Sequence, residues 1–190
     1  AVYFRPLPIA DPSRLVDITL AAPASRFGML SYEEFRDIER NVPALEDVIA
    51  IGRRGVTLHQ RGDAQLLLIE YVSGQFFPSL AIPMHLGRGF SANDDRPEAT
   101  TPQVVINHHL WQERLGSPPD VIGRTIQLDQ DALTVVGVMP PQFEIFEPGT
   151  DLWAPLPWEP GTSSFRTTFS QGVARLAPGV TIEAATRELQ

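Results

Sequence analysis

Residues 45–72, LEDVIAIGRRGVTLHQRGDAQLLLIEYV, decide the fold class of this chain. They contain three strand-like runs, Val48–Ile51, Val56–Leu58 and Leu66–Val72, in which β-branched and other apolar residues dominate. Turn-forming residues separate these runs, first at Gly52–Gly55 and then at Arg61–Asp63. The stretch therefore predicts antiparallel strands joined by short turns.

The β-rich pattern continues downstream. Gln103–Ile106 and Asp151–Leu156 are short strand candidates. Thr125–Leu128 and Leu133–Val138 alternate apolar and polar residues on either side of Asp129–Asp131. The spacing and turn chemistry of that segment predict a hairpin.

Helical patterns are fewer. Ser31–Val42 is the strongest, because its apolar residues recur at helical spacing and Ser31 with Glu34 forms a capping box. Gln75–Leu80 predicts a short helical turn, and Asn107 is placed to cap a further helix.

Strand-then-helix units bracket the β-rich middle. Leu15–Leu20 precedes the first helix, and Thr167–Leu176 precedes a helix that begins at Thr181. A strand and helix normally return to their sheet through another strand, so we expect the last unit to be incomplete. The pattern predicts an α+β fold in which a β-rich segment is inserted into a discontinuous α/β unit.

The composition supports a folded domain and excludes several functions. Of the 190 residues, 43% are hydrophobic and 20% charged, which excludes an intrinsically disordered chain. The net charge of −8 opposes binding to a phosphate backbone, so nucleic acid is not an expected partner. Because the chain has no Cys, disulfides, thiolate metal sites and Cys nucleophiles are excluded. No apolar run reaches the length that crosses a bilayer, and the N-terminus carries no signal-peptide pattern.

Two groups of residues invite a catalytic or metal-binding interpretation. His108 and His109 are adjacent, with Glu113 one helical turn later, but adjacent histidines point to different faces and no HExxH spacing exists. Asp94–Asp95 and Asp129–Asp131 could supply paired carboxylates, yet both lie in turn-like sequence without an EF-hand pattern. We interpret these residues as a helix start and as turns.

Other motifs have equally plain explanations. Gly87–Ala92 fits G-x-G-x-x-A, but Asn93–Pro97 follows it and breaks any helix that would hold a pyrophosphate. Arg61–Asp63 matches an adhesion tripeptide, and a hairpin turn explains it better. The three tryptophans, Trp111, Trp153 and Trp158, fit core packing better than a ligand surface. The residues alone predict no catalytic constellation and no cofactor or metal site.

Short motifs occur in a fixed order along nearly the whole chain. The first are Arg5–Pro8, Asp11–Val16 and Leu30–Phe35. The others follow in chain order: Val72–Phe77, Leu86–Phe90 with Asp94–Asp95, Leu110–Trp111, Val121–Thr125, Val135–Pro140, Asp151–Leu156, and Ala174–Leu176 with Pro178–Thr181.

This ordered set resembles the MacB-type periplasmic core domain of ABC transporter permeases, in the MacB/FtsX-like permease family and most closely its orphan-permease form. The resemblance implies two lobes. A membrane-proximal, porter-like lobe comprises residues 1–55 and 164–190 and is truncated at its C-terminal end, and a β-rich, sabre-like lobe comprises the inserted residues 56–163. It also implies that one membrane helix precedes Ala1 and that others follow Gln190.

The function implied by the resemblance is non-enzymatic. Such a domain lies on the extracytoplasmic face of the bacterial cytoplasmic membrane, in the periplasm, and couples motion of the membrane helices to an external partner or substrate. The implied partners are a partner permease or second copy of the chain, a cytoplasmic ATPase reached through the full-length permease, and a periplasmic adaptor protein.

Two rival functions belong to other classes. One is a secreted or surface module that binds a glycan or peptide through aromatic residues, and it predicts saturable binding that the change Trp158→Ala abolishes. The other is a metal-dependent hydrolase, which stoichiometric zinc in the purified protein would indicate. For the permease domain, the loop at Gly87–Pro97 is the predicted contact surface, with Arg88, Phe90, Asp94 and Asp95 as its candidate residues.

Overall fold

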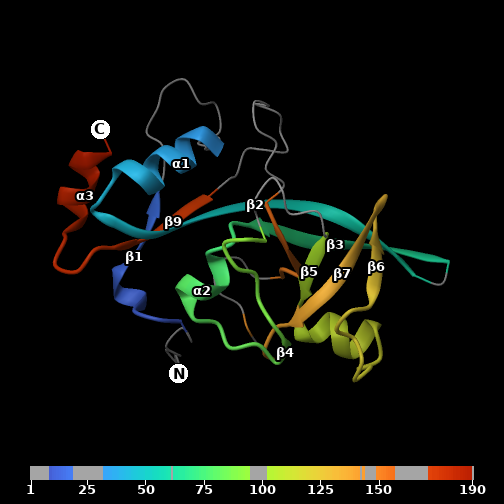
Figure 1. The fold of residues 1–190 in the computed structure, drawn as a ribbon. Helices are drawn as coiled ribbons and strands as arrows, with labels where there is room; N and C mark the ends of the chain where they lie inside the picture. The colour runs from blue at the N-terminus through green and yellow to red at the C-terminus, as the bar shows by residue number, and fades with distance from the viewer. Residues whose placement is uncertain are drawn as a thin grey trace, which may run out of the picture.

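The computed structural model describes residues 9–18, 32–60, 62–94, 102–141, 143, 149–156 and 171–189. Within them, nine strands form one sheet and the helices are short, as the α+β prediction requires (Figure 1). The strands are β1 (Leu15–Ile18), β2 (Leu45–Gln60), β3 (Asp63–Val72), β4 (Leu86–Gly87), β5 (Gln103–Ile106), β6 (Thr125–Leu128), β7 (Asp131–Val138), β8 (Leu152–Pro155) and β9 (Gln171–Leu176). The helices are η1 (Pro12–Arg14), α1 (Tyr32–Asn41), α2 (Phe76–Leu80), η2 (Leu110–Arg114) and α3 (Ile182–Glu188).

Part of this sheet closes into a ring. The strand order is β1-β9-β2-β3-β8-β5-β7-β4, and β6 pairs with both β7 and β2. The described strands β2, β3, β8, β5, β7 and β6 therefore form a closed six-stranded barrel. Only two residue pairs join β6 to β2, Leu58 with Leu128 and His59 with Gln127. Next to them, Asp129 Oδ1 accepts a hydrogen bond from the Thr57 backbone N–H at 2.7 Å, which extends the seam.

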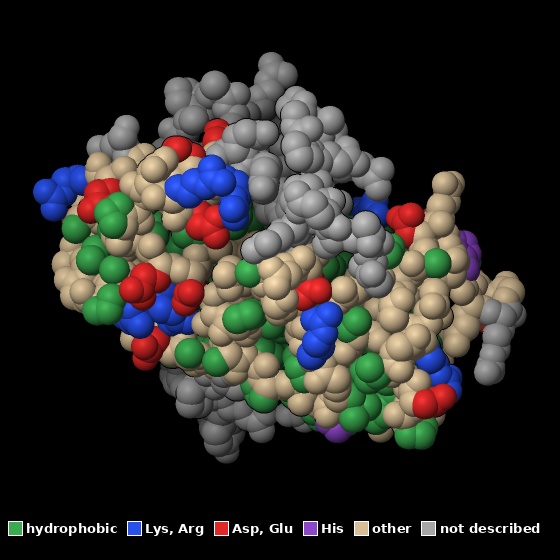
Figure 2. All heavy atoms as spheres, in the orientation of Figure 1, with side chains coloured by type: hydrophobic (Ala, Val, Ile, Leu, Met, Phe, Trp, Pro, Cys, Tyr) green, Lys and Arg blue, Asp and Glu red, His purple; other side chains and the backbone are tan. Residues whose placement is uncertain are grey.

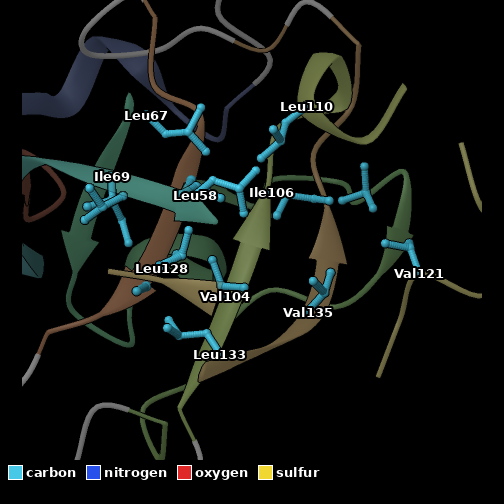
Figure 3. Close-up of a cluster of buried hydrophobic side chains, with 14 residues drawn as sticks. Leu58, Leu67, Ile69, Val104, Ile106, Leu110, Val121, Leu128, Leu133 and Val135 are labelled. Carbon is cyan, nitrogen blue, oxygen red and sulfur yellow. The ribbon is translucent and has the colours of Figure 1, made fainter. Parts of the chain in front are cut away.

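The interior of the barrel is filled by aliphatic side chains from all six strands. Inward-facing residues alternate along the strands, as in other barrels, except on β7, where a register shift in the pairing with β5 separates Val135 from Val138 by three residues. Figure 3 shows this cluster, to which Leu110 on η2 and Val121 add a cover. Its strand members are Val56, Leu58, Leu67, Ile69, Val104, Ile106, Leu128, Leu133, Val135, Val138, Leu152 and Ala154.

Beyond the barrel the sheet stays open and ends at β1. Helices α1 and α3 lie at this end of the molecule (Figure 1). Phe35 and Ile38 on α1 and Ala185 on α3 pack with Val48, Ala50 and the buried residues of β1 and β9. A third cluster centres on Phe76, Phe77 and Leu80 of α2, against Ile49 and Val72 of the sheet.

One prediction about the strands is wrong. Gly52–Gly55 does not interrupt the chain, because β2 runs unbroken for 16 residues and keeps its register with β3 from Ile51 to Gln60. Gly55 faces Leu68 across the ladder, and the side chain of Leu66 covers it. These glycines occupy a paired strand of the sheet and make no turn there.

The other predicted elements agree with the structure where it describes them. The hairpin turn after Gln60, the strand at Gln103–Ile106, the hairpin at residues 125–138 and the first helix are all present. Asn107 accepts the Leu110 backbone N–H at 2.6 Å, although the helix that follows has π geometry. Thr181 caps α3 by accepting the Ala184 N–H. Ser31 and residues 19–20 and 167–170 lie outside the described residues.

The predicted boundary between the two lobes falls at residue 55, inside the continuous strand β2. The division into porter-like and sabre-like lobes therefore stays a prediction. Among the described helices, none is long and apolar enough to span a bilayer.

Candidate functional site

The predicted contact loop is organised around the carboxylate of Asp94. Asp94 Oδ2 accepts hydrogen bonds from the Ser91 backbone N–H and hydroxyl, each at 2.8 Å, and from Arg88 Nη1 at 3.0 Å. Asp94 Oδ1 accepts from Gln103 Nε2 at 3.0 Å, and Arg88 Nη2 donates to Gln103 Oε1 at 2.9 Å. The loop is thereby tied to the start of β5 and held in one shape.

The same contacts lower the pKa of Asp94. Partial burial alone would raise it, but hydrogen bonds from Arg88 and Ser91 outweigh that effect and bring the pKa down to about 2. Asp94 is therefore ionised throughout the physiological range, as a structural carboxylate is, and is not poised for proton transfer.

Phe90 is not an exposed contact residue, which corrects our expectation for this loop. Its side chain is only 3% exposed and packs edge-on against Phe77, with ring centroids 5.2 Å apart. Gly89 lets this packing occur, because a Cβ there would lie 2.5 Å from the Phe77 ring. An aromatic residue in a loop is as suitable for anchoring the loop as for meeting a partner, and the sequence does not distinguish the two roles. Arg88 remains exposed, and Asp95 lies outside the described residues.

Gly87 and the described residues that follow it do not have the turn-then-helix geometry of a dinucleotide-binding motif. Gly87 adopts φ +69°, and a Cβ there would lie 2.2 Å from the Val136 carbonyl oxygen, so it permits a close backbone crossing. The described residues after it, through Asp94, form no helix. The glycines therefore permit close packing of a loop, in agreement with the sequence interpretation that no helix follows them.

Two of the four histidines, His85 and His108, form a small aromatic group with Trp111 at one end of the barrel. His85, His108 and Trp111 have ring centroids 4.8 to 5.2 Å apart, an arrangement that sequence distance alone did not indicate for His85. Desolvation and then the neighbouring His85 lower the pKa of His108. His109 is not part of this group, and its Nδ1 lies 3.3 Å from Glu113 Oε1. In the part of the chain that the structure describes, no three such side chains converge as a metal site needs.

The acidic residues at 129–131 serve a turn. Asp129 adopts φ 51° in the β6–β7 hairpin, and its carboxylate is engaged with Thr57 at the seam. Asp131 begins β7.

Trp153 is buried and donates its indole N–H to the buried carboxylate of Glu70 at 2.9 Å, whereas Trp158 lies outside the described residues.

A buried arginine that the residue-level interpretation did not single out joins three segments. Arg175 in β9 is 4% exposed, and its Nη1 donates to the carbonyls of Ala10 and Asp11, each at 2.8 Å. Its Nη2 donates to the Ser79 carbonyl at 2.8 Å, and its Nε meets Asp47 Oδ2 at 3.2 Å. A charged residue inside an apolar strand was the available signal, since such a group must be paired when buried.

A second arginine fixes the same N-terminal segment. Arg14 on η1 donates to the Leu176 carbonyl at 2.7 Å and forms ion pairs with Asp11 and Glu46. Together, Arg14 and Arg175 attach residues 10–14 to the sheet. On the face shown in Figure 2, acidic and basic side chains lie in mixed groups, as these ion pairs require.

The comparison with known families identifies the chain. Residues 3–190 match the family described as MacB-like periplasmic core domain. The chain belongs to this family. A MacB-like core domain is a periplasmic part of an ABC transporter permease, so its location is extracytoplasmic.

Relatives of known sequence or structure agree with this assignment. A probable export ATP-binding/permease protein MacB from Pseudomonas entomophila (strain L48) is 33% identical over 110 residues. These residues are 57% of this MacB-like core domain and 16% of that relative, so the chain spans a small part of its length.

Solved structures share the fold at low sequence identity. The periplasmic region of MacB from Actinobacillus actinomycetemcomitans has a TM-score of 0.71 at 13% identity, covering 96% of this chain and 82% of that one. The extracellular domain of the noncanonic ABC-type transporter YknZ from Gram-positive bacteria has a TM-score of 0.65 at 15% identity, covering 92% and 88%. A domain of a putative permease from Porphyromonas gingivalis has a TM-score of 0.62 at 19% identity, covering 86% and 71%.

Proposed function

We propose that this MacB-like core domain is a non-catalytic, stiff transmitter that carries motion of the membrane helices to an extracytoplasmic partner or substrate. The observation that carries the proposal is β2. This single strand of 16 residues pairs with β9 at the open end and with β3 and β6 in the barrel. A displacement at one end would therefore pass along a single strand that is paired both at the open end and in the barrel, with one β-bulge between Glu46 and Ile49 in its pairing with β9.

In this proposal, the membrane helices act on the domain through its N-terminal segment, residues 10–14. Residues 10–14 are held by Arg175 and Arg14, which contact backbone carbonyls on β9, α2 and the segment itself. A buried guanidinium with four partners resists displacement, because moving any one of them leaves a polar group unpaired. In this proposal, a membrane helix that moves the N-terminal segment also moves the sheet.

The proposed partners follow from the same role. A second permease copy or a partner permease lies beside the domain, an adaptor protein or substrate meets it outside the membrane, and an ATPase on the other side of the membrane supplies the energy. The function requires stiffness and a contact surface.

The test uses the parent permease together with the ATPase that drives it. Residues 1–190 contain no Cys, so spin labels can be placed at Gln130→Cys in the β6–β7 turn and at Thr186→Cys on α3. We expect the distance between these labels to stay constant between nucleotide-free and ATP-bound states. The distance from either label to a label on a membrane helix should change. A change within the domain instead, or no change in either distance, would refute the proposal.

A further inference from the structure

The β2–β3 hairpin carries an unpaired strand edge. Strand β8 pairs with β3 only from Ile69 to Val72, and Asp151 extends the contact to Leu68. Within the described residues, Asp63–Leu67 therefore has β2 on one side and no strand on the other. Figure 1 shows this end of the hairpin reaching out past β6 and β7.

The ladder determines which backbone groups point outward. Leu68 uses its N–H and C=O toward Asp151, on the side away from β2. Because backbone groups alternate sides along a strand, Ala64 and Leu66 also direct their N–H and C=O away from β2. The structure records no hydrogen bond on that side for either residue among those it describes.

The chemistry of this edge favours association. Residues 64–68 read AQLLL and contain no charge and no proline, and the β2–β3 register shows no bulge. Proteins ordinarily protect an exposed edge with one of these devices. Leu66 is 73% exposed and Leu68 37%, so the edge combines free backbone groups with apolar side chains on one face. Such an edge can receive an added strand.

We infer that this edge pairs, antiparallel, with the same edge of a second copy of the chain. Leu68 is already engaged, so the free groups of Ala64 and Leu66 fix the register. Ala64 of each copy pairs with Leu66 of the other, and Gln65 meets Gln65 on the two-fold axis. This register forms hydrogen bonds with every free outward group of the two residues.

The second copy is favoured because the edge is complementary to itself in this register. The small Ala64 lies opposite the large Leu66 twice, and Asp63 lies opposite Leu67, so no like charges meet. Such a short ladder is weak in solution, and the inference rests on the proposed function, in which both copies are held in one membrane at high effective concentration.

Disulfide formation in the parent permease tests the register. Residues that face each other in a non-hydrogen-bonded antiparallel pair have Cα atoms about 4.5 Å apart, within disulfide range. We expect Gln65→Cys to give a several-fold higher yield of covalent dimer than Thr186→Cys, an exposed control on α3. A dimer yield from Gln65→Cys that is no higher than the yield from Thr186→Cys would overturn the inference. A dimer from Leu66→Cys with none from Gln65→Cys would overturn the register.

Proline provides the matched test of the backbone contacts. Ala64→Pro removes an N–H that faces outward and leaves the β2 ladder intact, whereas the same change at Gln65 would break that ladder. In the Gln65→Cys background, Ala64→Pro should reduce the dimer several-fold while the Gln130–Thr186 label distance stays unchanged. An undiminished dimer, or a disulfide from the Gln65→Cys variant to another protein in place of the second copy, would overturn the inference. A variable Gln130–Thr186 distance together with a robust dimer would refute the stiff transmitter alone.

Discussion

The barrel and the open end of the sheet are stabilised in different ways. The barrel encloses aliphatic side chains on all sides, and neighbouring strands satisfy most of its backbone groups. The open end has β1 at its edge, relies on α1 and α3 for cover, and contains the buried guanidinium of Arg175. One sheet can therefore combine an apolar, closed part with a part whose geometry is set by polar contacts.

The comparison matters for transmission. Apolar packing is non-directional, whereas a hydrogen-bonded guanidinium fixes orientation. The polar junction lies where the N-terminal segment joins the sheet, at the position where the proposed function needs orientation to be preserved.

The largest expected difference is between two isoleucines. Ile106 is fully buried inside the barrel, and Ile38 on α1 is 8% exposed at the open end. We expect Ile106→Ala to lower the free energy of unfolding by about 4 kcal/mol and Ile38→Ala by about 2 kcal/mol, because a closed barrel cannot collapse around a cavity. Urea titration measures both. Equal losses would show that the two regions respond alike.

The polar junction should give the next largest effect. Arg175→Met leaves three backbone carbonyls, of which that of Ser79 is buried, and the Asp47 carboxylate without their donor, at a cost of about 3 kcal/mol. Arg14→Met is the matched control, and because its ion pairs are exposed we expect a clearly smaller loss of stability there. Thermal unfolding compares the two, and a milder effect at Arg175 than at Arg14 would contradict the role assigned to the junction.

Much of each region could be predicted from the sequence because its signals are local. Helix α1 and the β6–β7 hairpin follow from periodicity and turn residues within their own segments. Closure of the barrel could not be predicted in this way, since it depends on Leu58 meeting Leu128, a residue far along the chain. The turn predicted at Gly52–Gly55 is wrong for the same reason. These glycines stay in an extended strand because they pair with residues of β3, which the local sequence does not show.

The candidate loop was predicted in position but not in the roles of its residues. Arg88 and Asp94 were identified as surface residues, and the structure shows that they also hold the loop to β5 through Gln103. The buried side chain of Phe90 anchors the loop by packing against Phe77. These roles depend on Phe77 and Gln103, which lie outside the loop on either side of it, so no pattern within the loop itself reveals them.

The stability of the domain at low pH should depend on the contacts of Asp94. The pKa of Asp94 is about 2 in the folded protein against 3.8 ordinarily, so the folded state binds fewer protons between these values. The resulting stability is present above pH 3.8 and is lost as the pH falls toward 2, by about 1 kcal/mol in total once solvent screening of this partly exposed group is allowed for. Asp94→Asn should flatten this part of the pH profile, and Arg88→Met should move the loss to higher pH. A wild-type profile without this slope would contradict the assignment.

The smallest expected effect concerns His108. Because desolvation lowers the pKa of His108 in the folded protein below its ordinary value of 6.5, the unfolded chain takes up its proton first, and stability should decline as the pH falls through 6.5. The groups packed against it are His85 and Trp111. His108→Gln should reduce this decline, measured by thermal unfolding across the pH range. A decline of the same size in this variant would argue against the role of desolvation at His108.

The two-pair seam between β2 and β6 has a consequence for how the chain folds. The β2–β3 hairpin joins neighbouring residues and costs little loop entropy, whereas the seam brings together residues that are far apart in the chain. The hairpin can therefore form early and act as a template, and ring closure at Leu58 and His59 comes late. Until that last step, the aliphatic interior faces water, so the folding intermediate, and not the native domain, is the species most in need of protection from aggregation.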